Sequence, residues 1–161
     1  KDLKLYYARR KSSFGQLWPA SSSAGKPSLL LIASDGRSQP GELEWDSAAG
    51  IASFVIPRGM KKAVFFSEMF PVTAGRPFVL ALRPEGDFEG FVRVDFFRGG
   101  TMNFNFDVRR LTGSGRDGKT LLLKGFVWRG GAEGRVGIEI MGSGLRDTPV
   151  RWSGLKLYQG E

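Results

Sequence analysis

The stretch MFPVTAGRPFVLAL (Met69–Leu82) decides the fold, because it reads as two short strands joined by a Pro/Gly turn. In its second strand Phe78, Leu80 and Leu82 alternate with other residues, and side chains at such spacing share one face of a strand. More strand candidates follow at close spacing: Phe91–Phe97, Phe104–Val108, Leu121–Trp128, Arg135–Met141 and Trp152–Tyr158. Closely spaced strands without helical periodicity predict an all-β protein, an antiparallel two-sheet β-sandwich of jelly-roll-like form.

The same alternation predicts the core. Apolar side chains recur at every second position of each candidate strand, and these positions should face the space between two sheets. The predicted core residues are Phe78, Leu80, Leu82, Val92, Val94, Phe96, Phe104, Phe106, Val108, Val136, Ile138, Ile140, Leu155 and Leu157.

Composition limits the chemistry that the chain can perform. Its 161 residues fit one domain with a two-layer core. The absence of cysteine and histidine excludes disulfides, zinc–thiolate sites and catalysis that uses histidine as a base. The formal net charge is +8, and most of the 24 basic residues are arginine. Such a surface attracts anionic polymers, although scattered arginines also keep a β-protein soluble.

The domain organisation follows from the first third of the chain. Residues 1–27 are expected to form an N-terminal arm or linker, because residues 12–27 are rich in Ser, Ala, Gly and Pro. Residues 28–161 form the predicted sandwich domain. The longest apolar run, Leu29–Ala33, is far too short for a membrane span. Because the sequence starts at Lys1 without Met, we expect an accessory domain of a larger extracellular or bacterial envelope (periplasmic) protein.

Two motifs in the second half carry a family resemblance. One is Phe70-Pro71-Val72-Thr73-Ala74-Gly75, followed by Phe78-Val79-Leu80. The pattern in this motif is an aromatic residue, then Val-x-x-Gly, then a strand that opens with an aromatic residue. The other is the last strand, Val150–Leu157. Through them, about residues 41–158 resemble the galactose-binding-like jelly roll of many carbohydrate-binding modules. This resemblance implies non-catalytic glycan binding by an accessory domain.

The resemblance also bears on metals. Members of this family often hold a structural calcium ion, partly through an acidic residue near the final strand. Here Ser153 and Gly154 occupy that neighbourhood. We therefore expect no metal site and no cofactor.

The polar positions of the strands suggest a sugar-binding face. Carboxylates, amides and guanidinium groups hydrogen-bond hydroxyls, and an aromatic ring packs against the apolar face of a pyranose. Arg135, Arg151 and Lys156 also fall on polar positions. The alternative is a solvated face of cross-strand ion pairs, with the tryptophans in the core. The predicted site residues are Arg93, Asp95, Asn105, Asp107 and Glu139, with Trp128 and Trp152 as stacking platforms.

Two enzymatic interpretations are weaker. Gly113-x4-Gly118-Lys119-Thr120 has the spacing of a P-loop, but the βα units of that fold are missing, so we expect a hairpin connection. Asp95, Asp107 and Glu139 could supply a carboxylate pair for glycoside hydrolysis, yet such pairs are common on β-sheets.

We therefore expect a non-catalytic domain that binds a polysaccharide, neutral or anionic, next to other domains of a parent protein. Nucleic acid is not the expected partner. The alternative is a structural or protein-interaction sandwich with no small ligand.

Overall fold

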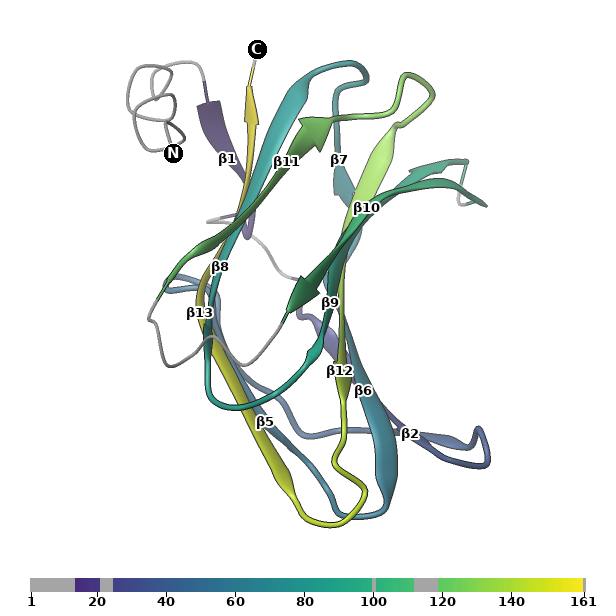
Figure 1. Cartoon of the computed structure of the whole chain (residues 1–161). Coiled ribbons are helices and arrows are strands. Elements are labelled where there is room, and N and C mark those ends of the chain that lie inside the picture. Colours follow the sequence, from purple (N-terminus) through teal and green to yellow (C-terminus); the bar gives the residue numbers. More distant parts are fainter. Residues whose placement is uncertain (1–13, 21–24, 100, 112–118, 161) are drawn as a thin grey trace.

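The computed structural model describes residues 14–20, 25–99, 101–111 and 119–160, with backbone only for 101–111. These residues form two antiparallel sheets that face each other across one core (Figure 1). The six-stranded sheet has the order β11-β8-β13-β5-β4, with β1 paired to β13. The seven-stranded sheet has the order β10-β9-β12-β6-β2-β3, with β7 paired to β12. This arrangement confirms the predicted all-β sandwich.

The strands of each sheet come from the whole length of the described chain. The six-stranded sheet consists of β1 (Phe14–Trp18), β4 (Glu44–Asp46), β5 (Ile51–Ile56), β8 (Pro77–Glu85), β11 (Leu121–Phe126) and β13 (Thr148–Gly160). The seven-stranded sheet consists of β2 (Ser28–Ala33), β3 (Ser38–Pro40), β6 (Met60–Phe66), β7 (Phe70–Pro71), β9 (Gly90–Arg98), β10 (Thr101–Leu111) and β12 (Glu133–Met141). The described residues contain no helix long and apolar enough to cross a membrane.

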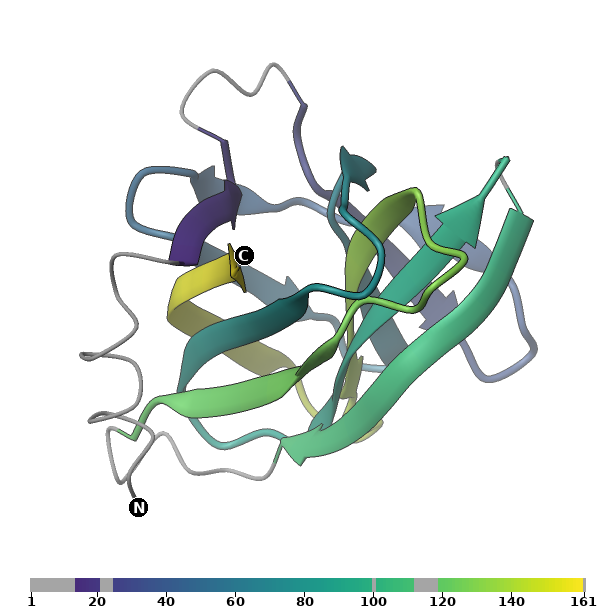
Figure 2. The same cartoon turned by 90° about the horizontal axis from the view of Figure 1, so that it is seen from above.

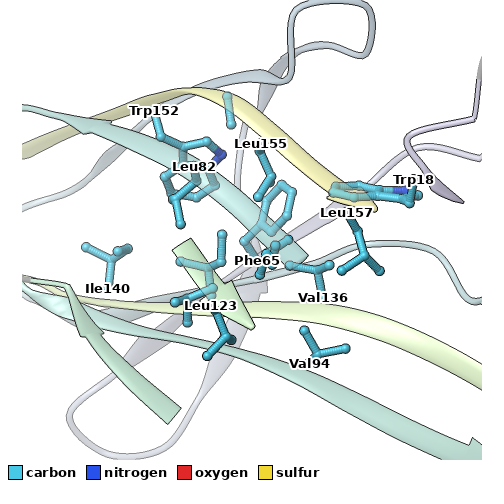
Figure 3. Packing of buried hydrophobic residues seen from close by; sticks show 14 of the residues in the cluster. Trp18, Phe65, Leu82, Val94, Leu123, Val136, Ile140, Trp152, Leu155 and Leu157 are labelled. Atoms are coloured by element: carbon cyan, nitrogen blue, oxygen red, sulfur yellow. The ribbon is translucent and has the colours of Figure 1, made fainter. Parts of the chain in front are cut away.

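The core fills the space between the sheets, as the alternation predicts. In Figure 3, Leu82 and Leu157 of one sheet point toward Val136 and Ile140 of the other. Predicted core residues with described side chains are all buried: Phe78, Leu80, Leu82, Val92, Val94, Phe96, Val136, Ile138, Ile140, Leu155 and Leu157. The side chains of Phe104, Phe106 and Val108 lie outside the described part.

Part of the predicted arm belongs to the sandwich. Strand β1 lies within residues 1–27 and pairs with β13, so the two strands run side by side (Figure 2). Trp18, at the end of β1, is buried and stacks on Trp45 with ring centroids 5.6 Å apart. Its indole N–H donates a hydrogen bond to the Glu68 carboxylate. The Ser-, Gly- and Pro-rich composition around β1 concealed this short strand.

Strand β11 ends earlier than predicted, at Phe126 instead of Trp128. After Phe126 the Val127 N–H donates to the Arg76 carbonyl, and the Trp128 carbonyl accepts from the Gly131 N–H. The first bond continues the pairing with the segment before β8, and the second closes a turn that begins at Trp128.

A β-bulge interrupts β13 between Ser153 and Lys156. Gly154 has a φ of 62°, a left-handed conformation that glycine adopts without steric cost. The N–H groups of Gly154 and Leu155 donate to the carbonyls of Ala49 and Gly50, both at 3.0 Å, so the turn before β5 covers the bulge. The extra residue shifts the alternation, and Trp152 before the bulge and Leu155 after it both face the core.

Candidate functional site

The outward surface of the seven-stranded sheet gathers charged side chains on three adjacent strands, β6, β12 and β9. In the register, Arg135 lies opposite Asp95, and Gly137 lies opposite both Arg93 and Phe66. Since directly opposed residues share a face, side chains from distant parts of the sequence meet here. We call this set the charged face: Lys62, Phe66, Phe91, Arg93, Asp95, Phe97, Arg135 and Glu139.

Asp95 is the centre of the charged face. It is 0% exposed, although it lies on the outward side of the sheet. Its Oδ1 accepts from Arg93 Nε at 2.9 Å, and its Oδ2 accepts from Arg135 Nη2 at 2.9 Å and Nε at 3.3 Å. A buried carboxylate requires such charge-assisted partners, because burial removes its hydration. The two arginines therefore cover Asp95 and hold its charge.

Arg135 also packs against two aromatic rings. Its guanidinium carbon lies 3.9 Å from the Phe66 ring centroid and 4.9 Å from that of Phe97. These rings come from β6 and β9, the strands on either side of β12. Gly137 leaves room for this packing, because a Cβ there would approach Phe66 at 3.3 Å and Arg93 at 3.4 Å. The planar group is thus fixed in position by both rings and by Asp95.

A second ion pair extends the charged face. Lys62 Nζ lies 2.6 Å from Glu139 Oε1, and Arg93 Nη1 lies 3.9 Å from Glu139 Oε2. Lys62 and Glu139 are each about one quarter exposed at the side chain. The five charged groups therefore form one continuous network that solvent or a ligand can reach at Lys62, Glu139 and the arginines.

An exposed aromatic ring lies beside this network. Phe91 is 42% exposed and stands directly opposite Glu139 in the register of β9 and β12. In the same row across the sheet, Val64 is opposite Glu139 and Leu30 is opposite Val64. Apolar side chains thus flank a charged one, an arrangement that offers both a stacking surface and hydrogen-bonding groups.

The structure brings three predicted site residues together and separates others. Arg93, Asp95 and Glu139 all lie on the charged face. Arg151 and Lys156, which share the polar pattern, belong to β13 in the other sheet. There Arg151 Nε pairs with Glu85 Oε2 at 2.7 Å. The two polar sets form separate surfaces because alternation does not reveal which sheet a strand joins.

Trp152 is a correction to the predicted site. It is 0% exposed and packs edge-on against Phe65 and Phe54, with ring centroids 5.1 and 5.6 Å away. Figure 3 shows its ring between the sheets. It cannot stack on a sugar at the surface. The prediction placed Trp152 near a strand end, but β13 begins at Thr148, so Trp152 lies within the strand, and the bulge at Gly154 lets both Trp152 and Leu155 face the core.

Trp128 does not lie on any of the three strands that form the charged face. It follows β11, is partly buried, and packs against the edge of the core. Its ring covers Gly130, where a Cβ would approach the ring at 2.5 Å. Trp128 is therefore part of the turn before β12, and its role in binding remains a prediction.

Asn105 and Asp107 have described backbones but no described side chains. Asn105 pairs with Asp95, which places its position beside the charged face. The P-loop-like segment falls mostly on residues 112–118, outside the described part. Among the described residues, no cluster of three or more acidic side chains is arranged to hold a metal ion.

Sequence reasoning missed Lys62, Phe66 and Phe91, and it did not assign Phe97 and Arg135, which it placed on the outward face, to the site. In β6 both faces are apolar, as Val64 and Phe66 face outward and Ala63 and Phe65 inward. Because both faces of β6 are apolar, a period-two pattern could not indicate which of its residues face outward. Arg135 had a signal, since it shares its phase with Glu139 on β12.

A cleft of about 670 Å³ lies between two connections that cross from one sheet to the other, and none of its lining residues belongs to the charged face. Residues 85–89 form one wall, residues 141–149 form the other, and Ser53–Val55 of β5 close it. The Arg151–Glu85 ion pair stands at its rim. The cleft was not predicted, because it depends on how the loops lie together.

No protein-family model and no curated protein matches this sequence. The chain is similar to solved structures at low identity. The enzymatically active domain of bacteriophage CBA120 tailspike protein 4 is 15% identical over 90% of this chain, with a TM-score of 0.47, but this chain spans only 18% of that one. TmCBM61, in complex with β-1,4-galactotriose, is 11% identical over 86% of this chain and 90% of its own, with a TM-score of 0.46. The carbohydrate-binding module CBM4 is 13% identical over 81% and 94%, with a TM-score of 0.45.

Proposed function

We propose that this chain binds a polysaccharide through the charged face and leaves the ligand chemically unchanged. It would act as a galactose-binding-like accessory domain of a larger secreted or cell-envelope protein. The observation that carries the proposal is the exposed Phe91 ring beside the ion-paired Glu139 and Arg93. The network fixes the polar groups before a ligand arrives, so binding costs little side-chain entropy.

The burial of Asp95 argues for binding over hydrolysis. A general acid or nucleophile must reach the glycosidic bond. Asp95 is fully buried, and both of its oxygens accept hydrogen bonds from arginine. Asp95 and Glu139 therefore do not form a usable catalytic pair, although Glu139 remains available to accept a hydrogen bond from a sugar hydroxyl.

Replacement of Phe91 tests the proposal. Stacking that covers about 60 Å² of the ring at about 25 cal/mol per Å² contributes about 1.5 kcal/mol, which is roughly tenfold in affinity. Phe91→Ala should therefore weaken binding about tenfold to the tightest ligand of a panel of neutral and acidic polysaccharides, measured by calorimetry.

Phe126 supplies the matched control. It is 64% exposed but lies on β11 in the other sheet. Phe126→Ala should leave the affinity unchanged. If both variants fold and bind like the parent, the charged face is not the site. If the parent binds no polymer of the panel, the domain is a structural or protein-interaction sandwich.

A further inference from the structure

The charged face offers many hydrogen-bond donors and few acceptors. It holds three cationic side chains, Lys62, Arg93 and Arg135, against the carboxylates of Asp95 and Glu139, which leaves one positive charge. Asp95 is buried, and its oxygens are already occupied by the two arginines. Glu139 Oε1 is occupied by Lys62. A ligand that approaches this face therefore meets mainly N–H groups.

The guanidinium of Arg135 has one edge to which no described side chain bonds. A guanidinium carries five N–H donors in one plane. Nε and one N–H of Nη2 are directed to Asp95, and the rings of Phe66 and Phe97 contact the planar group. Among the side chains that the structure describes, Asp95 is the only acceptor bound to Arg135. No described side chain accepts a hydrogen bond from the Nη1–Nη2 edge, and Arg135 is 24% exposed at the side chain.

Arg93 is in a similar position. Its Nε donates to Asp95, while its Nη1 is 3.9 Å from Glu139 Oε2, beyond hydrogen-bonding distance. Its side chain is 25% exposed. Two guanidinium groups are thus held by one buried carboxylate, and Arg93 lies two residues from the exposed Phe91 on the same face of β9.

Resting on the proposed function, we propose that the charged face selects polysaccharides whose sugars carry carboxylates, the uronic acids. A carboxylate is planar, and its two oxygens match two parallel N–H groups of a guanidinium edge in a bidentate pair. The pyranose ring would then pack on Phe91, and a neutral hydroxyl would use the donors less completely. The net charge of +8 adds long-range attraction for such a polymer.

Two polymers that differ only in charge test this proposal. Polygalacturonate should bind at least tenfold more tightly than the same polymer with its carboxylates highly methyl-esterified, at about 50 mM salt, and the gap should narrow at about 500 mM salt. Equal binding of the two polymers would overturn the selection of uronates and leave the proposed function intact. Dextran sulfate serves as a third polymer, and binding as tight as that of polygalacturonate would overturn the preference for carboxylates.

Variants locate the effect on the charged face. Arg93→Gln should reduce polygalacturonate binding at least fivefold and leave the esterified polymer unaffected. Arg135→Lys keeps the charge but loses the planar guanidinium edge, so it should also reduce polygalacturonate binding at least fivefold. Arg151→Gln changes the net charge equally but lies on the other sheet, so it should have no effect. A loss with Arg151→Gln as large as with Arg93→Gln would show general charge attraction and overturn the proposal.

The failure of this proposal differs from failure of the proposed function. If the parent binds both polymers equally and Phe91→Ala weakens binding of both, the face binds polysaccharide without selecting uronates. If Phe91→Ala changes nothing, the site itself is wrong. If Arg135→Lys does not fold by circular dichroism, the Arg93→Gln result decides the selectivity.

Discussion

Asp95 is a charged residue whose environment comes entirely from its neighbours in the sheet. Its two arginine partners belong to β9 and β12, one two residues away and one 40 residues away in sequence. Burial of a carboxylate is unfavourable unless its charge is compensated, so the arginines hold Asp95 in place and Asp95 in turn orders them. The positions of Arg93 and Arg135 on the charged face therefore depend on this one side chain.

We predict that Asp95→Ala lowers the free energy of unfolding by about 2–4 kcal/mol, because it leaves two arginines without their acceptor. The arginines are about one quarter exposed, so solvent compensates part of the loss. Urea denaturation followed by circular dichroism measures the change.

The exposed pair of Arg151 and Glu85 gives the control. Its side chains are 49% and 31% exposed, so Glu85→Ala should cost only about 0–1 kcal/mol. Losses of the same size for Asp95→Ala and Glu85→Ala would show that burial of Asp95 does not matter.

Among individual residues, alternation predicted the inward positions well and the outward ones poorly. Val94, Ile138 and Leu80 are buried because apolar side chains at every second position of a strand all face the core between the sheets. The prediction for Trp152 was wrong because β13 begins at Thr148, and the bulge at Gly154 lets both Trp152 and Leu155 face the core. The positive φ that makes the bulge possible is not visible in the sequence, where Gly154 resembles any other glycine.

At the scale of elements, the turn before β5 and the bulge of β13 depend on each other. A Cβ on Gly50 would approach the backbone N and O of Leu155 at 2.5 Å, and Gly50 has a φ of 62°. No side chain can avoid a clash with backbone atoms there. Close approach of two backbones therefore holds β5 and β13 together at this point.

We predict that Gly50→Ala destabilises the fold by about 1–3 kcal/mol more than Gly36→Ala, measured as the difference in the midpoint and free energy of urea unfolding. Gly36 also has a positive φ, 87°, but no atom lies within 4 Å of a Cβ there. Both substitutions carry the conformational cost, and only Gly50→Ala adds the clash. If the two variants are equally stable, the close approach of the backbones at Gly50 does not contribute to the free energy of unfolding.

The sequence predicted most strands but could not assign them to sheets. The stretches around Phe91–Phe97 and Arg135–Met141 form β9 and β12 within two residues of the expected bounds. Their partners lie far away in sequence, as β12 pairs with β6 and β9, and β13 with β5 and β8. Pairing of this kind is decided by the packing of the whole core. For this reason the set of polar residues was predicted, but its division between two surfaces was not.

For the whole molecule, β1 is the first strand that the structure describes, and it contributes to the core. It pairs with β13, and Trp18 at its end is buried between Trp45 and Phe70. Loss of a buried tryptophan typically costs about 3–5 kcal/mol. We predict that a chain starting at Phe14 is more stable than one starting at Ser28 by at least this amount, as measured by thermal and urea unfolding.

If the chain starting at Ser28 unfolds at the same urea concentration as the chain starting at Phe14, β1 is dispensable and the sandwich begins at residue 28. A Trp18→Ala variant in the longer chain separates the two contributions of β1. It removes the ring but keeps the backbone pairing with β13.

The tryptophans lie away from the charged face, so tryptophan fluorescence reports on the core and not on that face. Trp18 and Trp152 lie in the core, Trp45 and Trp128 pack at its edge, and the aromatic side chains of the charged face are phenylalanines. Indole emission depends on the solvent around the ring, so the intrinsic fluorescence of the folded chain reports on whether the core is intact. A ligand on the charged face would leave that emission unchanged, and a flat fluorescence titration would not indicate a lack of binding.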